Sequence, residues 1–311
     1  MSCPVSLEKR TTLRELLEKG QIFAPCVWDC FSARAAELAG FKAILLSSGA
    51  QAWAMLGMPD TGMLTSEECV QMTERICTTS KLPLIVDADE GYGSSPLNVY
   101  RTCQRLAKAG AMAITIDDTS GFRGWERIFF DTGYKMEIIP DDLFLAKIAA
   151  AVEAVKGTDC MIIARTGARH FYSFDNAIDR MVKATELGAD MAMVLAINCL
   201  DDCKKIAERV PGWKMYPDVV SRNGVPDVQL EDIAKLGFNL VSMHYLEKAA
   251  MWGMLDYGIH NWQNQNTVYS DSHDMGGLMS SKDALYSYCD APAWMNLEKE
   301  FRERSLEIMK K

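Results

Sequence analysis

The chain has 311 residues, of which 49% are hydrophobic and 24% are charged. This composition excludes a disordered or low-complexity chain, and the length suits one large barrel domain or two ordinary domains. The net charge of −9 disfavours a nucleic-acid-binding surface, which needs clustered lysine and arginine, although a pocket can differ in sign from the whole surface.

The ten cysteines are scattered, with no C-x-x-C pair and no zinc-type spacing. We therefore expect reduced, mostly buried thiols and a cytoplasmic protein. The amino-terminal sequence MSCPVSLEKRTT lacks the apolar region of a secretory signal, and no run of about 18 apolar residues predicts a membrane span.

In chain order, TTLRELLEKG predicts a short helix that would close the base of a barrel. A repeated pattern follows, in which a helical stretch ends in glycine and a short apolar run comes next, at Gly40, Gly110, Gly188 and Gly237. The pattern predicts eight buried strands, near residues 22–27, 42–47, 83–87, 112–117, 160–165, 190–195, 214–217 and 239–242. Eight strand–helix units indicate an α/β (β/α)₈ TIM barrel with an added amino-terminal helix. The competing doubly wound sheet would show fewer strands and a G-x-G-x-x-G motif after the first.

The pattern stops near residue 260, where a polar, glycine-containing stretch predicts a linker followed by a strong carboxy-terminal helix. We therefore divide the chain into a catalytic barrel, residues 1–260, and a linker with a helical arm, residues 261–311. The arm's Tyr, Trp and Met side chains would pack either on a neighbouring subunit, which we favour, or on the chain's own barrel.

Chemistry in such a barrel is built at the carboxyl ends of the strands. The predicted strand ends carry Ser47, Ser48, Gly49, Asp87, Asp89, Asp117, Arg165 and His244. Carboxylates after the third and fourth strands would surround a hard divalent cation such as Mg²⁺, which takes oxygen ligands. Arg165 on the next strand would pair with a substrate carboxylate. Each aspartate taken singly has an ordinary alternative, the N-cap of the helix after its strand.

Three segments resemble the isocitrate lyase and phosphoenolpyruvate mutase superfamily: SSGAQAWAMLGMPDTGMLT, VDADEGYGSSPLNVYRTCQRLAKAGAMAITIDD and IIARTGA. The resemblance runs over about residues 10–258. It implies a (β/α)₈ barrel that binds Mg²⁺ (or Mn²⁺) and an α-oxyacid, in a homotetramer that exchanges a helix between subunits.

The resemblance also implies roles for particular residues. Ser47, with the backbone of Ser48 and Gly49, matches the segment that holds the substrate, and Arg165 matches the arginine that binds its carboxyl end. Asp60 matches an aspartate close to the waters of the metal, and Asp87 matches the direct metal ligand. Asp89 and Asp117 match the outer ligands. The family more often has Glu at the position of Asp117. Because Asp is shorter than Glu, the contact of Asp117 with the metal would run through water.

The departures from the family pattern bear on the reaction. The loop at 119–139 lacks the cysteine and histidine of isocitrate-type lyases, and the strand-six end VLAIN lacks their glutamate. The oxaloacetate decarboxylase branch shares these departures and has a histidine at the end of strand eight, where His244 falls. As a functional residue His244 would contact the substrate; its ordinary alternative is a buried, hydrogen-bonded histidine.

We therefore predict an Mg²⁺-dependent lyase that decarboxylates oxaloacetate to pyruvate and CO₂, with Arg165, His244 and Asp60 as catalytic residues. The alternatives are a C–C lyase of the 2-methylisocitrate or alkylmalate type and a phosphonopyruvate-type mutase or hydrolase. The loop at 119–139 is rich in aromatic residues and carries Arg123 and Arg127, so this aromatic loop would suit such a larger substrate. A barrel that only binds a ligand is the non-enzymatic alternative.

Overall fold

The computed structural model describes residues 11–120, 137–272, 286 and 288–310. Its contacts divide the chain into a compact unit, Arg10–Leu246, and a second unit that contains Glu247–Lys311. The division therefore falls at Leu246, and the barrel was expected to end near residue 260.

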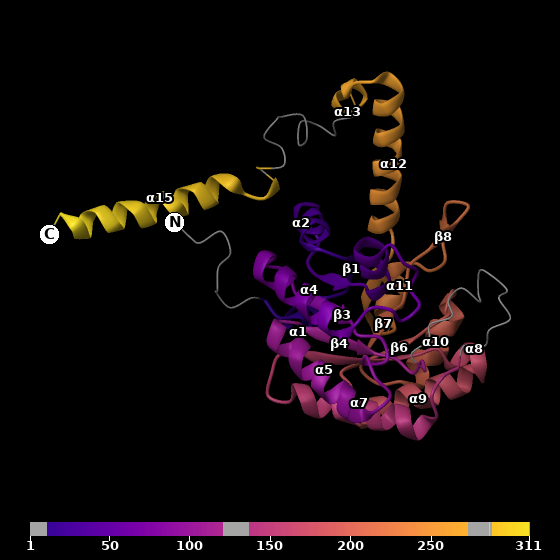
Figure 1. The fold of residues 1–311 in the computed structure, drawn as a ribbon. Helices are drawn as coiled ribbons and strands as arrows, with labels where there is room; N and C mark the ends of the chain where they lie inside the picture. Colours follow the sequence, from indigo (N-terminus) through magenta and orange to yellow (C-terminus); the bar gives the residue numbers. More distant parts are fainter. Residues whose placement is uncertain (1–10, 121–136, 273–285, 287, 311) are drawn as a thin grey trace. The chain divides into compact units, whose positions relative to one another are not determined.

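The compact unit is built on a closed barrel of eight parallel strands in the order β1-β10-β7-β6-β5-β4-β3-β2 (Figure 1). The strands are β1 (Ile22–Val27), β2 (Ile44–Leu46), β3 (Leu84–Asp87), β4 (Ala113–Ile116), β5 (Met161–Thr166), β6 (Met191–Val194), β7 (Trp213–Tyr216) and β10 (Phe238–Met243). A short antiparallel pair, β8 (Ser221–Arg222) and β9 (Val225–Pro226), follows β7. The predicted (β/α)₈ barrel is confirmed, and every predicted strand overlaps an observed one.

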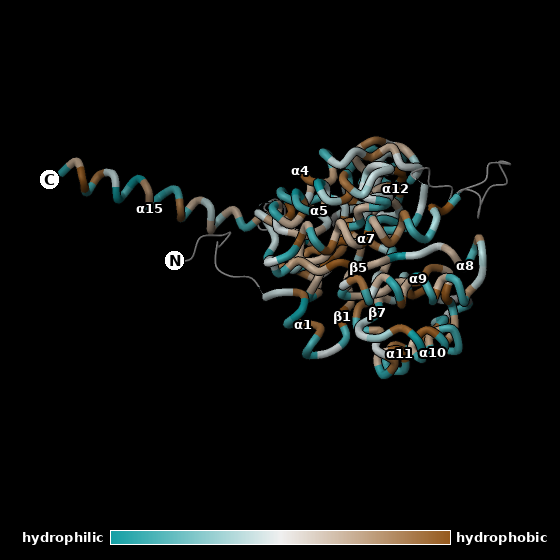
Figure 2. Tube along the Cα trace, turned by 90° about the horizontal axis from the view of Figure 1, so that it is seen from below, coloured by the Kyte–Doolittle hydropathy of each residue, from teal (hydrophilic) through white to brown (hydrophobic). Residues whose placement is uncertain are grey.

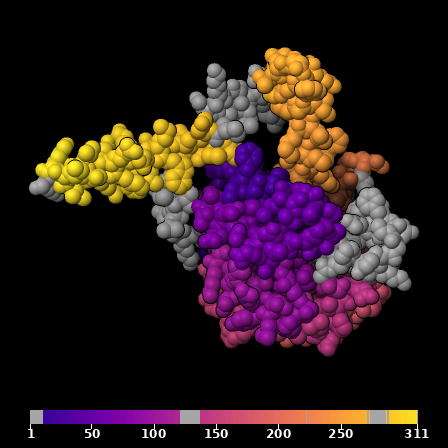
Figure 3. All heavy atoms as spheres, in the orientation of Figure 1, coloured from indigo at the N-terminus to yellow at the C-terminus, as the bar shows by residue number. Residues whose placement is uncertain are grey.

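Helices surround the strands, as the sequence pattern predicted. They are α1 (Leu13–Lys19), α2 (Cys30–Leu38), α3 (Ser48–Gln51), the π-helix η1 (Ala52–Leu56), α4 (Ser66–Thr79), α5 (Pro96–Ala109), α7 (Asp141–Val155), α8 (Ala168–Phe171), α9 (Phe174–Glu186), α10 (Leu200–Arg209) and α11 (Leu230–Lys235). Teal and brown alternate along α9 and α10, as expected of helices with one buried face (Figure 2). In the space-filling view, α4 and α5 belong to the indigo-to-magenta surface that covers the strands (Figure 3).

Local chemistry explains where these helices begin and end. Thr65 and Glu68 form a capping box that starts α4, with Thr65 accepting from the Glu68 amide and Glu68 accepting from the Thr65 amide. Gly110 ends α5 with φ of +106°, and a Cβ added there would lie 3.0 Å from that of Cys77. Glycine is required at this position by both conformation and space, as the glycine-ended repeats predicted.

The barrel interior is filled by apolar side chains from alternating strand positions, among them Ala24, Leu45 and Ile163. Leu13 and Leu17 of α1 belong to the same buried cluster. The amino-terminal helix therefore closes the barrel interior, as the sequence analysis expected.

The second unit contains α12 (Leu246–Asn264), α13 (Val268–Ser272) and α15 (Ala291–Met309). A carboxy-terminal helix was expected, but residues 261–264 and 268–272, expected as linker, are helical. The polar side chains of these segments form hydrogen bonds and ring contacts within the unit, and a polar composition alone does not predict such contacts. Tyr269 donates to Asp256 at 2.8 Å and stacks on His260 with 4.1 Å between ring centroids.

In the part of the chain that the structure describes, no helix combines the length and apolar character needed to cross a membrane.

We predict that Leu17→Ala lowers the free energy of unfolding by about 2–5 kcal/mol, because it leaves a cavity in the closed end of the barrel. Urea unfolding followed by circular dichroism measures the effect. The matched control is Leu97→Ala on α5, where the leucine is 78% exposed and truncation should cost less than about 0.5 kcal/mol. Equal midpoints for the two variants would show that α1 contributes no core packing.

Candidate active site

A guanidinium at the carboxyl end of β5 joins the ends of three successive strands. Arg165 Nη1 donates to Asp87 Oδ2 at 3.0 Å, and Nη2 donates to Asp117 Oδ2 at 2.6 Å. At most 11% of any of these three side chains is exposed. The predicted metal ligands Asp87 and Asp117 and the predicted substrate-binding arginine therefore come together, but with the arginine paired to the aspartates.

Asp89 joins this cluster through Ser48. The Ser48 hydroxyl donates to Asp89 Oδ1 at 2.7 Å and lies 3.4 Å from Asp87 Oδ2. Asp89 has φ of +53°, in the left-handed region that non-glycine residues rarely adopt. Such a conformation costs free energy and is found preferentially at functional sites. The loop after β3 therefore holds Asp89 toward Asp87 at the expense of backbone strain.

Asp60 and the segment after β2 lie beside the same cluster. A Cβ added to Gly49 would lie 2.9 Å from Asp60 Oδ2, so the Asp60 carboxylate occupies the space that glycine leaves open. Ser47 is buried and caps α3, its hydroxyl accepting from the Ala50 amide at 3.2 Å. The structure thus places Asp60 against the predicted substrate segment, whereas the Ser47 hydroxyl is engaged in a cap.

His244 follows β10 at the same mouth of the barrel. Its amide donates to Asp218 Oδ1 at 3.0 Å, and its Nδ1 lies 3.5 Å from the same oxygen. Burial lowers the pKa of His244, but Cys26 and Asp218 beside the ring raise it more, so the pKa lies well above its usual value. The His244 side chain is 38% exposed, so solvent reaches the ring, and the raised pKa favours the protonated form.

Residues outside the predicted site support it from behind. Asp118 accepts from the Thr166 hydroxyl at 2.5 Å and from Arg180 at 3.0 Å, and burial raises its pKa. Lys147 on α7 donates to the carbonyls of Glu90 and Gly93, and burial lowers its pKa. The available signal was a cationic residue on the buried face of two helices, Lys147 on α7 and Arg180 on α9. Asp29, another strand-end aspartate, is the N-cap of α2.

The donors at this mouth fit a hard divalent cation. Among the described residues, no three His, Cys, Asp or Glu side chains form a ready metal cage. Mg²⁺ typically uses only one or two carboxylates and keeps several waters. Asp87, Asp89, Asp117 and Arg165 are all buried, so three carboxyl groups lie beside a single guanidinium. This chemistry, oxygen donors with a local excess of negative charge, suits Mg²⁺ or Mn²⁺.

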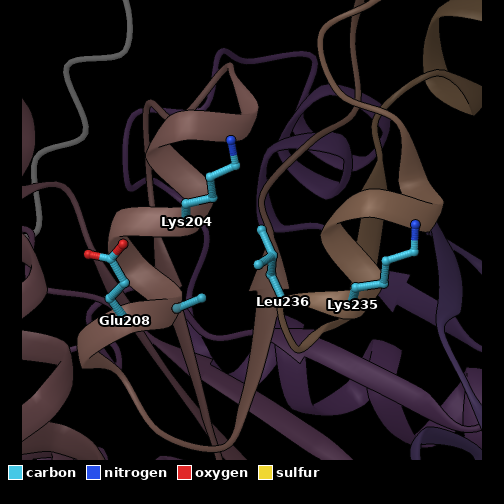
Figure 4. A pocket seen from close by; sticks show the side chains of 5 residues that line it. Lys204, Glu208, Lys235 and Leu236 are labelled. Atoms are coloured by element: carbon cyan, nitrogen blue, oxygen red, sulfur yellow. The ribbon is translucent and has the colours of Figure 1, made fainter.

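Two other features fall outside this cluster. Most of the predicted aromatic loop, with Arg123 and Arg127, lies in residues 121–136, outside the described part of the chain. A groove of about 380 Å³ lies between α10 and α11, with Lys204 and Glu208 on one side and Lys235 and Leu236 on the other (Figure 4). It contains none of the predicted site residues.

Comparison with known proteins places this geometry in a family. The model of the phosphoenolpyruvate phosphomutase family matches residues 13–258. The chain is 30% identical to the petal death protein of Dianthus caryophyllus over 300 residues, 96% of this chain and 91% of the relative. It is 33% identical to an oxaloacetate decarboxylase of Rhodopseudomonas palustris (strain HaA2) over 207 residues, 66% of this chain and 69% of the relative.

A solved structure also matches nearly the whole chain. The crystal structure of 2,3-dimethylmalate lyase superposes with a TM-score of 0.79 and 25% identity, over 94% of this chain and 99% of that one. That lyase is described as a member of the PEP mutase/isocitrate lyase superfamily. The chain therefore belongs to the phosphoenolpyruvate phosphomutase family, within the superfamily of isocitrate lyases and PEP mutases.

Proposed function

We propose that this enzyme decarboxylates oxaloacetate to pyruvate and CO₂ with the help of Mg²⁺, for which Mn²⁺ would substitute. The observation that carries the proposal is the buried cluster of Asp87, Asp89, Asp117 and Arg165 at the mouth, with a cationic histidine on the same rim. The similarity to an oxaloacetate decarboxylase supports the choice of substrate.

Asp87 would hold the cation directly, and Asp89 and Asp117 would hold it through water. When bound, the cation supplies a Lewis acid that withdraws electron density from the 2-oxo group of the substrate. With a cation held by these aspartates, the mouth would no longer repel a small anion.

The chain's own residues orient the acid and deliver a proton. We propose that Arg165 turns from an aspartate to the substrate carboxylate, since its planar fork matches carboxylate geometry. The backbone of Ser47 to Gly49, against Asp60, limits the substrate to one orientation, which supplies the proximity effect. After CO₂ leaves, the His244 imidazolium donates a proton to C3, and pyruvate forms.

A second candidate function is the cleavage of a C–C bond in a larger 2-hydroxy acid. The likeness to 2,3-dimethylmalate lyase over 94% of this chain favours it. The loop at 119–139 has no cysteine or histidine to serve as the acid, and for this reason we place decarboxylation first.

We also propose that the helical arm packs on a neighbouring subunit of a homotetramer. The supporting observation is a set of exposed apolar side chains on α12 and α15: Met251, Trp252, Met254, Leu255, Ile259, Trp262, Trp294, Met295 and Phe301. Exposed apolar surface of this extent marks an interface.

The substrate is tested with a panel of 2-oxo and 2-hydroxy diacids in the presence of Mg²⁺, with CO₂, pyruvate and glyoxylate measured separately. We expect equal amounts of CO₂ and pyruvate from oxaloacetate, well above the rate with Mg²⁺ alone. Turnover should stop with a chelator and return with Mg²⁺ or Mn²⁺. Glyoxylate release from a hydroxy acid would instead support C–C cleavage. No turnover of any acid would support the ligand-binding barrel.

We predict that Arg165→Lys lowers kcat/KM at least about 100-fold, because lysine keeps the charge but loses two-pronged pairing with the substrate carboxylate. Steady-state kinetics with oxaloacetate measure the effect, and circular dichroism checks the fold. Arg209→Lys, on the exposed pair with Asp175 and Asp179, is the control and should retain full activity. Near wild-type kcat/KM in Arg165→Lys would remove Arg165 from the mechanism.

We predict that His244→Gln slows decarboxylation about 100-fold while Mn²⁺ affinity, measured by electron paramagnetic resonance, stays unchanged. The proton donor is the charged imidazole, so wild-type activity should fall as the pH rises through the raised pKa of His244. His260→Gln is the control for loss of a histidine elsewhere. If His244→Gln keeps full activity, His244 is a structural residue.

A further inference from the structure

The barrel register brings a thiol to the side of His244. Pro25 of β1 pairs with Met243 of β10, so the next residues along these parallel strands, Cys26 and His244, lie side by side. Cys26 is fully buried and belongs to the cluster that fills the barrel interior. The Cys26 thiol therefore points into the barrel just below the mouth, beside the His244 imidazole.

The strand on the other side of β10 brings a carboxylate to the same ring. Asp218 follows β7, and its Oδ1 lies 3.0 Å from the His244 amide nitrogen and 3.5 Å from Nδ1. The backbone around Asp218 is fixed by the fully buried Ser242. The Ser242 hydroxyl donates to the Pro217 carbonyl, and the Ser242 carbonyl accepts from the Val219 amide at 3.4 Å.

We propose that Cys26 and Asp218 are positioning residues for His244, holding its imidazolium between them as the proton donor of the reaction. This inference rests on the proposed function. The carboxylate pairs with Nδ1 of the ring at 3.5 Å and accepts from the His244 amide, as second partners of catalytic and metal-bound histidines commonly orient the ring. The Cys26 sulfur holds the His244 ring from the neighbouring strand, β1.

The proton transfer from His244 to C3 balances. The electron pair left on C3 by departing CO₂ forms the new C–H bond, and the Nε2–H bond of the imidazolium breaks, because Nδ1 faces Asp218. The neutral imidazole then takes a proton from water through its exposed part, so each CO₂ released consumes one solvent proton.

The electrostatics agree with this arrangement. The titratable groups with the largest effect on the pKa of His244 are Cys26 from β1 and Asp218 from the segment after β7. Both raise its pKa against the lowering effect of burial. Removal of either partner should therefore lower the pKa of His244 and leave less of the acid form at neutral pH.

The test is an NMR pH titration of the histidine ring signals of the whole chain, in which His244→Gln assigns the His244 signal among four histidines. We expect Asp218→Asn and Cys26→Ala each to lower the His244 pKa by about one unit or more, and Cys26→Ser to restore part of the shift. The matched control is Asp256→Asn. Asp256 Oδ1 lies 3.3 Å from His260 Nδ1, so this variant should move the His260 signal and leave His244 unchanged.

Measurements of decarboxylation distinguish a failure of the positioning role from a failure of the proposed function. The high-pH limb of kcat should move to lower pH in Asp218→Asn and Cys26→Ala but not in Asp256→Asn. An unchanged His244 pKa in both variants would overturn the positioning role, even if oxaloacetate is a good substrate. A lowered pKa in a chain that does not decarboxylate oxaloacetate would support the positioning role and overturn the proposed function.

Discussion

The ion pairs of Arg165 with Asp87 and Asp117 are the constraint on which the rest of the site depends. Charges as buried as these are tolerated only when they are paired and hydrogen-bonded. One guanidinium satisfies two carboxylates and thereby fixes the carboxyl ends of β3, β4 and β5 relative to one another. With Asp89 included, three carboxylates lie beside one guanidinium, and for this reason we propose that a cation binds here.

The surrounding structure protects this arrangement. Asp118, the neighbour of Asp117, turns to the other side of β4 and binds Arg180 and the Gly167 amide, which ties β4 to β5 from outside. Lys147 holds two carbonyls of the strained loop after β3. These contacts allow Asp89 to keep a backbone conformation that would relax in a free peptide. Rigidity at the mouth is therefore maintained by buried charge on both sides of the sheet.

Much of this could be predicted from the sequence. Glycine-ended helices followed by apolar runs located the strands, and residues at strand ends identified Asp87, Asp117 and Arg165. The ion pairs of Arg165 with Asp87 and Asp117 could not be predicted, because they depend on side-chain conformations across three strands. Periodicity alone also does not decide which of Asp117 and Asp118 faces the mouth.

Other features required coordinates for different reasons. Cys26 and His244 are more than 200 residues apart, and only the β1–β10 register makes them neighbours. The helical stretches at 261–264 and 268–272 depend on bonds between polar side chains, such as that of Asn261 to Ser270. The chemistry of a strand end can be recognised in a few consecutive residues, whereas these contacts join residues that lie from nine to more than 200 positions apart.

The central claim is that this acidic mouth binds a divalent cation and a small oxyacid together. A crystal structure of the chain with Mg²⁺ and oxalate tests it most directly. The account predicts the cation beside Asp87, with the oxalate carboxylate paired to Arg165. Oxalate bound elsewhere, with Arg165 still paired to both aspartates and no cation beside Asp87, would contradict it.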